Sequence, residues 1–185
     1  MSQKRKTGIQ FLKNFRETGA FKETSRSVEL EICTSIPSDR AVTVVEFGMG
    51  HGNITKEILS TISSDSKLYA FEVNQEFCEH VQESINDDRL VIINDGAENL
   101  KKHLNEKIDS VVSSIPFSFL SDNKGHSIIQ DAYDLLETEG WFSQVLLTKF
   151  NFKKFKSVFE ECEMVKLPNF PAEYIYHCQK KHGKF

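Results

Sequence analysis

The sequence lacks several features that would place it in a specialised class of protein. Its apolar runs are short, such as residues 90–93, whereas a membrane-spanning helix needs about 20 residues. The amino terminus has no apolar core typical of a secretory signal, so we expect a cytoplasmic protein. Its four cysteines (Cys33, Cys78, Cys162 and Cys178) form no Cys-x-x-Cys pair, which argues against a zinc site and against a disulfide scaffold. We expect no metal site.

The chain also has no internal repeat, no low-complexity tract and no linker rich in proline, glycine or serine. Its 185 residues, 39% hydrophobic and 27% charged, are ordinary for one soluble domain. We therefore predict a single domain over residues 27–185. Residues 1–26 precede it as a basic amphipathic segment that either covers the ligand pocket as a lid or contacts a membrane.

What the sequence does have is an uneven distribution of charge. The net charge of −4 combines +5 over residues 1–26 and +4 over residues 149–185 with −13 over residues 27–148. Basic ends suit an anionic partner and an acidic middle suits a cationic ligand, although solvated surface charge is the plain alternative. Several of the 15 phenylalanines lie among the lysines of both ends, a composition that suits a membrane surface or a nucleic acid.

Helical segments alternate with short β-rich runs, a pattern typical of a parallel sheet covered by helices. We expect helices at 27–36, 53–61, 75–85, 127–137 and 152–162. We expect strands at 42–47, 67–72, 90–93, 108–113, 141–147, 164–167 and 174–178. Only a short loop separates the last two strands, too short for a crossover helix, so they should pair as an antiparallel hairpin. The prediction is an α/β fold with a mainly parallel seven-stranded sheet, an antiparallel last strand and helices on both faces.

A glycine-rich turn follows the first predicted strand and opens a helix. Its pattern is Glu-x-Gly-x-Gly-x-Gly, formed by Glu46, Gly48, Gly50 and Gly52. Such a turn lets a ligand approach the backbone and aims helix amides at a negative group. A dinucleotide fingerprint would need glycine at position 53, where this chain has Asn53. A tight turn without a ligand is the other alternative.

Further acidic residues end the next two predicted strands. Glu72 ends the second strand, and Asp95, Gly96 and Ala97 follow the third. The carboxyl ends of parallel strands are where ligands of open α/β sheets bind, so these residues should share a site with Glu46.

These motifs resemble motif I and the following acids of the class I S-adenosylmethionine-dependent methyltransferases, which have a Rossmann-like fold. The resemblance implies S-adenosylmethionine as cofactor. Glu46 would receive its ammonium, Gly48, Gly50 and Gly52 would approach it, and Glu72 would accept the ribose hydroxyls. Asp95, with Gly96 and Ala97 beside it, would face the adenine.

The segment after the fourth strand resembles the acceptor motif of amino-methyltransferases and rRNA adenine dimethylases. It reads Ser113-Ser114-Ile115-Pro116-Phe117, with Ser114 where those families have asparagine. The resemblance implies that Ser113, Ser114 and Pro116 help to direct an amine at the methyl group, with Phe117 as an aromatic face.

A closer resemblance is to the bacterial phospholipid N-methyltransferases, which methylate phosphatidylethanolamine. It rests on segments 19–26, 48–55, 113–116 and 168–174. Glu23, Ser114 and Phe170 depart from that family's pattern. The implied function is N-methylation of a phospholipid amine at an anionic membrane surface. RNA adenine N-methylation, methylation of another small amine, and a non-catalytic cofactor-binding protein remain alternatives.

A protonated amine must lose a proton before methyl transfer, and three residues are candidate bases. They are Tyr174, His126, which we expect in a loop over residues 121–127, and His51.

A separate expectation concerns Phe152, Phe155 and Phe159, whose spacing is that of one helix face packed on the sheet.

Overall fold

The computed structural model describes residues 24–181, which form one seven-stranded sheet in the order β3-β2-β1-β4-β5-β7-β6. Its strands are β1 (Thr43–Phe47), β2 (Lys67–Phe71), β3 (Leu90–Ile93), β4 (Ile108–Ser113), β5 (Leu136–Leu146), β6 (Glu161–Leu167) and β7 (Glu173–Gln179). Strand β7 pairs antiparallel with β5 and with β6, while the pairs from β3 to β5 are parallel. The predicted sheet and its terminal hairpin are confirmed.

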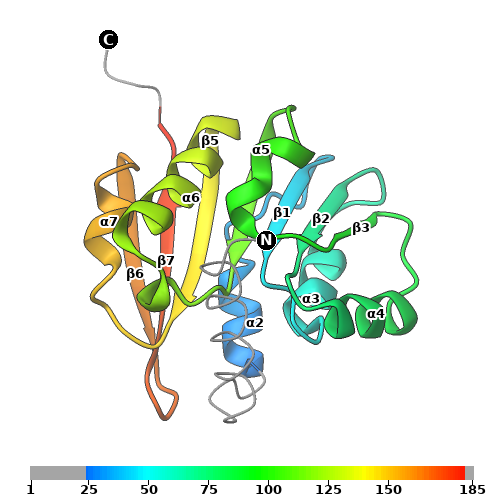
Figure 1. Cartoon of the computed structure of the whole chain (residues 1–185), viewed down its shortest axis with the longest axis horizontal. Helices are drawn as coiled ribbons and strands as arrows, with labels where there is room; N and C mark the ends of the chain where they lie inside the picture. Colours follow the sequence, from blue (N-terminus) through cyan, green and yellow to red (C-terminus); the bar gives the residue numbers. More distant parts are fainter. Residues whose placement is uncertain (1–23, 182–185) are drawn as a thin grey trace, which may run out of the picture.

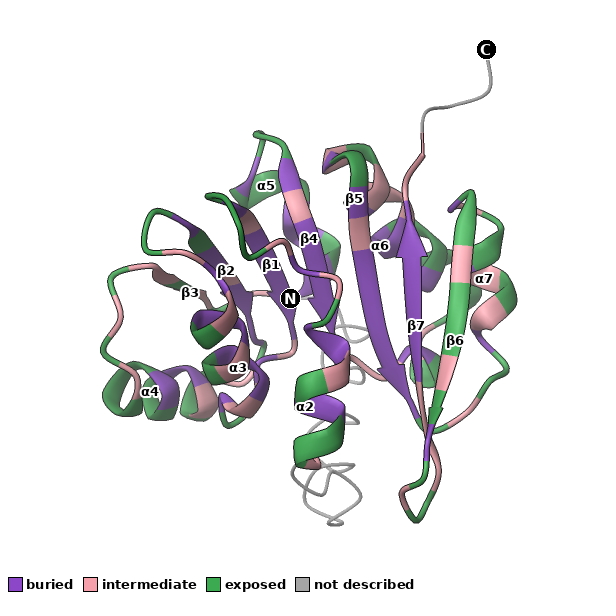
Figure 2. Cartoon of the chain, turned by 180° about the vertical axis from the view of Figure 1, so that it is seen from behind, coloured by how far each residue is buried: buried purple, intermediate pink, exposed green. Residues whose placement is uncertain are grey.

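Helices cover both faces of this sheet. They are α2 (Arg26–Ile32), α3 (Asn53–Thr61), α4 (Gln75–Ser84), α5 (Leu100–His103), α6 (Asp122–Leu135) and α7 (Phe152–Lys156), with 3-10 turns η1 (Ala97–Asn99) and η2 (Phe117–Phe119). Figures 1 and 2 show α5, α6 and α7 on one face and α2, α3 and α4 on the other. Side chains alternate along β1, so that Val45 packs with the α6 face and Val44 with the α2 and α3 face.

Several predicted boundaries were wrong. Helix α6 begins at Asp122 because the Ser121 side chain caps it by accepting from the Lys124 amide, so His126 lies on a helix rather than in a loop. Helix α7 ends at Lys156, and Phe159 lies beyond it. Both Phe155 and Phe159 are nevertheless buried in the core that faces the sheet, as predicted, and Phe152 packs against that core.

The predicted segment over residues 1–26 lies outside the described residues, apart from residues 24–26. No helix within residues 24–181 is long and apolar enough to span a membrane. The same residues contain no cluster of three or more side chains suited to hold a metal ion.

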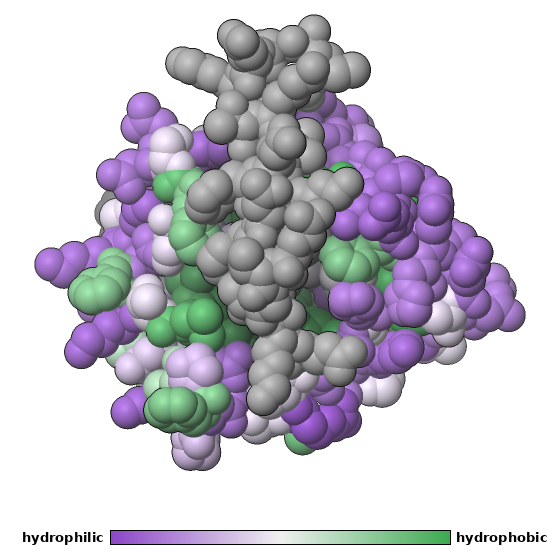
Figure 3. Space-filling model, turned by 60° about the horizontal axis from the view of Figure 1, so that its bottom comes forward, coloured by the Kyte–Doolittle hydropathy of each residue, from purple (hydrophilic) through white to green (hydrophobic). Residues whose placement is uncertain are grey.

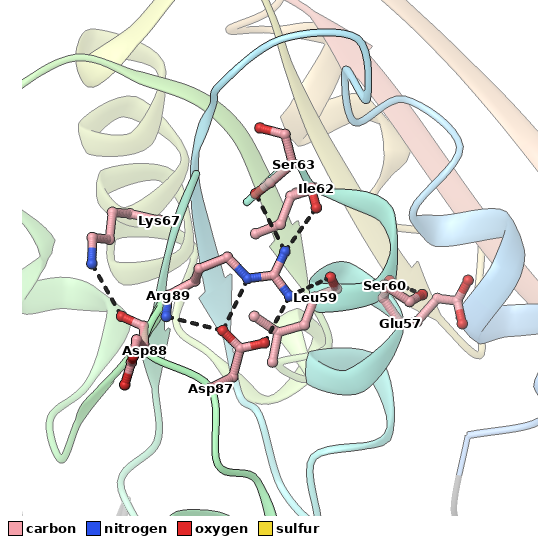
Figure 4. Close-up of polar contacts among 9 residues, drawn as sticks. All are labelled: Glu57, Leu59, Ser60, Ile62, Ser63, Lys67, Asp87, Asp88 and Arg89. Carbon is pink, nitrogen blue, oxygen red and sulfur yellow. Dashed lines mark hydrogen bonds and ion pairs between the residues drawn. The ribbon is translucent and has the colours of Figure 1, made fainter. Parts of the chain in front are cut away.

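Arg89, just before β3, closes the carboxyl end of α3 (Figure 4). Its guanidinium donates to the carbonyl oxygens of Leu59 and Ile62 at 2.8 Å and of Ser63 at 3.3 Å. It also binds both carboxylate oxygens of Asp87, at 2.9 and 2.7 Å. These bonds satisfy carbonyls that the end of a helix leaves without partners. They tie α3, and with it the glycine turn before α3, to the neighbouring strand.

Candidate active site

The glycine turn joins β1 to α3 at the edge of the sheet where the parallel strands end, the lower edge in Figure 1. Gly48, Gly50 and Gly52 all have positive φ, at 82°, 54° and 85°, a region that L side chains rarely adopt. A Cβ on Gly48 would lie 3.0 Å from the Ile115 side chain, and one on Gly52 would lie 3.1 Å from Val81. A Cβ on Gly50 would meet no atom of residues 24–181 within 4 Å. Two glycines therefore allow close packing, whereas Gly50 borders open space that a ligand can fill.

Glu46 is buried at the end of β1, with 1% of its surface exposed. Its Oε2 accepts from the Thr55 hydroxyl at 2.7 Å, while its Oε1 is buried without a hydrogen-bond partner in the described part of the chain. Burial raises the pKa of Glu46 to about 8; the Thr55 hydrogen bond works against this and the nearby Glu72 charge adds to it. A buried acceptor oxygen with no partner is suited to a cationic group of a ligand.

Glu72 follows β2 and holds the glycine turn in place through a hydrogen bond. Its Oε2 accepts from the Gly50 amide at 3.1 Å, and its Oε1 accepts from the Asn74 amide at 2.9 Å. A carboxylate oxygen can accept more than one hydrogen bond, so these contacts are compatible with ribose hydroxyls at the same carboxylate. The structure thus brings Glu72 and Gly50 together, as the sequence predicted for two parts of one site.

Asp95 follows β3 and is held by three groups. Its Oδ1 accepts from the Gly96 amide at 2.8 Å and from the Asn99 side chain at 2.7 Å, and its Oδ2 pairs with His103 at 2.9 Å. Burial acts to raise the pKa of Asp95, but these hydrogen bonds outweigh it and leave the pKa below its ordinary value. Ala97 is buried at the start of η1. Sequence reasoning missed Asn99 and His103, whose only local signal was their position shortly after a strand-end acid.

The turn after β4 lies directly against the glycine turn. The Ser114 amide donates to the Phe47 carbonyl at 2.9 Å, and the Ser114 hydroxyl donates to the Gly48 carbonyl at 2.7 Å. Ser113 is fully buried, and its hydroxyl has no hydrogen-bond partner within residues 24–181. The two predicted motifs therefore meet, since β1 and β4 are neighbours in the sheet.

Gln144, on β5 beside Ser113, was missed by sequence reasoning. Its amide nitrogen donates to the Ile115 carbonyl at 3.0 Å, and the Phe117 amide donates to the same carbonyl at 3.0 Å. A carbonyl oxygen has two lone pairs, so these bonds occupy both acceptor positions of Ile115. Among the residues that the structure describes, the buried Gln144 Oε1 atom has no hydrogen-bond partner.

The prediction that Phe117 offers an aromatic face to the acceptor is wrong. Its ring is fully buried and packs edge-on against Phe155, with 5.2 Å between ring centroids. The reason is that η2 begins directly after Pro116 and turns Phe117 under α6 and into the core rather than toward the edge of the sheet.

The three candidate bases do not come together. Tyr174 is half-buried near the start of β7, opposite Leu146 at the end of β5, and so lies at the same edge as the acceptor motif. His126 is exposed on α6. His51 is exposed on the glycine turn and packs edge-on against Phe77 of α4, with 4.5 Å between ring centroids.

A seven-stranded sheet of this order, with a glycine turn after β1 and acids after β2 and β3, defines a class I S-adenosylmethionine-dependent methyltransferase. The chain belongs to the family described as methyltransferase domain, whose sequence model matches residues 44–140. Its cofactor is S-adenosylmethionine. The partnerless Glu46 oxygen and the open space beside Gly50 fit such a ligand, which has a cationic amino-acid end.

The chain is 26% identical over 152 residues to an ornithine lipid N-methyltransferase of Singulisphaera acidiphila, covering 78% of this chain and 79% of that protein. Among solved structures it is similar to an rRNA methylase from Streptococcus thermophilus, with a TM-score of 0.64, 17% identity, and coverage of 88% of this chain and 100% of the other. A methyltransferase fold from Streptococcus mutans, solved with SAH, has a TM-score of 0.62 and 18% identity, over 84% of this chain and 99% of the other. These two structures show a shared fold.

Proposed function

We propose that this methyltransferase transfers a methyl group to the amine nitrogen of a membrane lipid, such as phosphatidylethanolamine or an ornithine lipid. One observation carries the proposal. The similarity to the ornithine lipid N-methyltransferase extends over 152 residues, well beyond the 44–140 segment that marks the family as a whole. Both lipids present a primary amine close to an anionic surface. The proposed location is the inner face of the membrane, with the enzyme peripheral to it.

Four groups would hold the cofactor. Glu46 would attract the ammonium of its methionyl end, and the open space at Gly50 would let it approach the backbone. Glu72 would accept the ribose hydroxyls, and Asp95, fixed by His103, would accept from the adenine amine. When bound, S-adenosylmethionine supplies an electrophilic methyl group on a sulfonium sulfur.

The chain's own part in the reaction is to orient a neutral amine in line with that methyl group. The nitrogen lone pair forms the new N–C bond while the C–S bond breaks, and a proton leaves the amine. Ser113 and Gln144 bring buried oxygens, which have no hydrogen-bond partner in the described residues, to the ends of β4 and β5, where they can accept from the amine. Tyr174, at the same edge, is our preferred proton acceptor over His126 and His51.

RNA adenine methylation is a second candidate, since an rRNA methylase shares the fold. In the acceptor motif of the rRNA adenine dimethylases, an asparagine and a neighbouring carbonyl are suited to hold the adenine amine. Here Ser114 stands in place of asparagine and donates to Gly48, and the Ile115 carbonyl already accepts two hydrogen bonds. These contacts favour a lipid amine over adenine.

The test follows label from methyl-labelled S-adenosylmethionine. The acceptors are anionic vesicles of phosphatidylcholine and phosphatidylglycerol, alone or with phosphatidylethanolamine or ornithine lipid, and total RNA in parallel. We expect label in the lipid fraction only when an amine lipid is present, and none with the Asp95→Asn variant. Label in RNA alone, or no label in any lipid while the chain binds the cofactor, would overturn the proposal.

A further inference from the structure

Several large apolar side chains are exposed at the edge of the sheet that carries the site, and Leu147, Phe150 and Phe170 are the most exposed of them. Leu147 and Phe150 follow β5 and are 51% and 84% exposed, and Phe170 lies in the β6–β7 hairpin loop and is 100% exposed. Both loops leave the carboxyl ends of their strands; the loop after β5 adjoins the acceptor motif that follows β4, and the hairpin lies farther along the same edge. Figure 3 shows this edge coming forward, with separate hydrophobic areas among hydrophilic surface. Exposed apolar side chains grouped near one site form a candidate contact surface, whereas single ones are common on protein surfaces.

Phe150 and Phe170 each stand next to an asparagine whose side chain is hydrogen-bonded. Asn151 is buried, and its side chain donates to the Ser118 hydroxyl at 3.0 Å, in the turn that carries the acceptor motif. Asn169 donates to the Ser25 hydroxyl at 2.9 Å and accepts from Ser27 at 3.3 Å. The two loops are therefore fixed to the body of the protein, while the neighbouring phenyl rings are turned outward.

The charges around these rings suit an anionic surface. Residues 147–157 contain four lysines and no Asp or Glu. Lys154 is paired with Asp122 at 2.7 Å, whereas Lys149 and Lys153 are exposed and form no ion pair with any residue in 24–181. Cations beside exposed apolar groups are the combination with which peripheral proteins bind anionic bilayers.

We propose that Leu147, Phe150 and Phe170, with Lys149 and Lys153, form a docking surface for an anionic lipid bilayer. This inference deepens the proposed function, on which it rests, by stating how the acceptor edge meets its lipid. The composition of the β6–β7 hairpin loop favours a bilayer over RNA as the partner of this surface. Residues 168–172 contain no charged side chain, so a backbone phosphate has nothing there to neutralise it, whereas an apolar ring can enter the headgroup layer.

The test uses the full chain and vesicles of phosphatidylcholine and phosphatidylglycerol, which contain no primary amine. Docking is thus measured independently of methyl transfer. Co-sedimentation compares the wild type with the Phe150→Ser/Phe170→Ser double variant, and with Val91→Ser as the matched control. Val91 is also an exposed apolar residue, but it lies on β3 at the opposite side of the sheet.

We expect the double variant to bind these vesicles about tenfold more weakly or worse, and Val91→Ser to bind like the wild type. A Lys149→Glu/Lys153→Glu variant should lose binding at low salt and differ little from the wild type at high salt. Cofactor affinity should be unchanged in all of them, which shows that they fold.

Wild-type binding by the double variant would overturn the docking surface. The docking surface would also be overturned if the wild type did not bind vesicles but bound RNA through the same residues. If docking holds while no lipid amine becomes methylated, the proposed acceptor fails and the docking surface stands.

Discussion

The Thr55 hydroxyl donates to Oε2 of Glu46 at 2.7 Å in the buried space between α3 and β1. The contact joins the first turn of α3 to the first residue of the glycine motif. The second oxygen of Glu46 has no hydrogen-bond partner among residues 24–181, and burial raises the pKa of this carboxyl to about 8. The fold therefore destabilises the charged form of Glu46, the group that we propose for binding the cofactor ammonium.

The first prediction concerns the stability of Glu46→Gln. Because the carboxyl binds its proton more tightly in the folded chain, its stabilising contribution is full below the ordinary value of 4.5 and is lost as the pH rises through about 8. The wild type should lose unfolding free energy over this range relative to Glu46→Gln, by up to about 5 kcal/mol at about 1.4 kcal/mol per unit of pKa. Chemical denaturation of both proteins at several pH values measures the difference. Parallel curves for the two would contradict the assignment.

The same variant should lose affinity for S-adenosylmethionine, because a neutral amide attracts an ammonium less than a carboxylate does. Gain of stability and loss of affinity in one variant would separate the two roles of Glu46. Thr55→Val is the matched control, since it keeps the carboxyl and removes only the hydrogen bond. Calorimetry with the cofactor checks both variants, and a Glu46→Gln affinity equal to that of the wild type would exclude the proposed contact.

We expect Gly50→Ala to lose mainly cofactor affinity and Gly52→Ala to lose mainly stability. Both residues have positive φ, so each alanine costs about 1 to 2 kcal/mol of backbone strain. The Gly52 Cβ also presses on Val81 at 3.1 Å, so we expect the larger loss of melting temperature there. The Gly50 Cβ enters open space, so we expect a folded protein with cofactor affinity reduced by about tenfold or more. A Gly50→Ala variant with normal affinity would show that the ligand lies elsewhere.

His103 is predicted to act as a positioning residue through Asp95. Removing its hydrogen bond in His103→Ala should weaken cofactor binding by about fivefold, while His103→Gln restores part of it. Asp95→Asn should cost more, because it changes the group proposed to meet the adenine. The comparison is made with adenosine as a separate ligand, and a loss of stability without any change in adenosine affinity would make His103 merely structural.

Arg89→Leu is expected to destabilise the fold without touching the site. The guanidinium satisfies three carbonyls of the α3 end and pairs with Asp87, so its loss should cost about 2 to 3 kcal/mol (Figure 4). Lys67→Ala removes an exposed bond to the Asp88 carbonyl in the same region and should cost less than about 0.5 kcal/mol. Denaturant melts compare the two. Equal losses would mean that the Arg89 network contributes little.

Much of the candidate site was predictable because its signals are local. The glycine pattern between β1 and α3 needs only the residues that make the turn, since each positive φ requires glycine at its own position. Glu72 and Asp95 were found because both end strands with clear apolar runs. The start of α6 was missed because residues 122–127 are polar, although Ser121 was a readable cap.

By itself, the sequence determined the order of the strands and of the helices other than α5, the glycine turn, the strand-end acids and the terminal hairpin, because local periodicity and turn chemistry specify them. Only the tertiary structure decided which distant residues meet: His103 with Asp95, Gln144 with Ile115, and Asn169 with Ser25. It also placed Phe117 in the core and left Phe150 and Phe170 in solvent. The physical reason is that such contacts depend on the order of strands in the sheet and on packing across it, which no local pattern encodes.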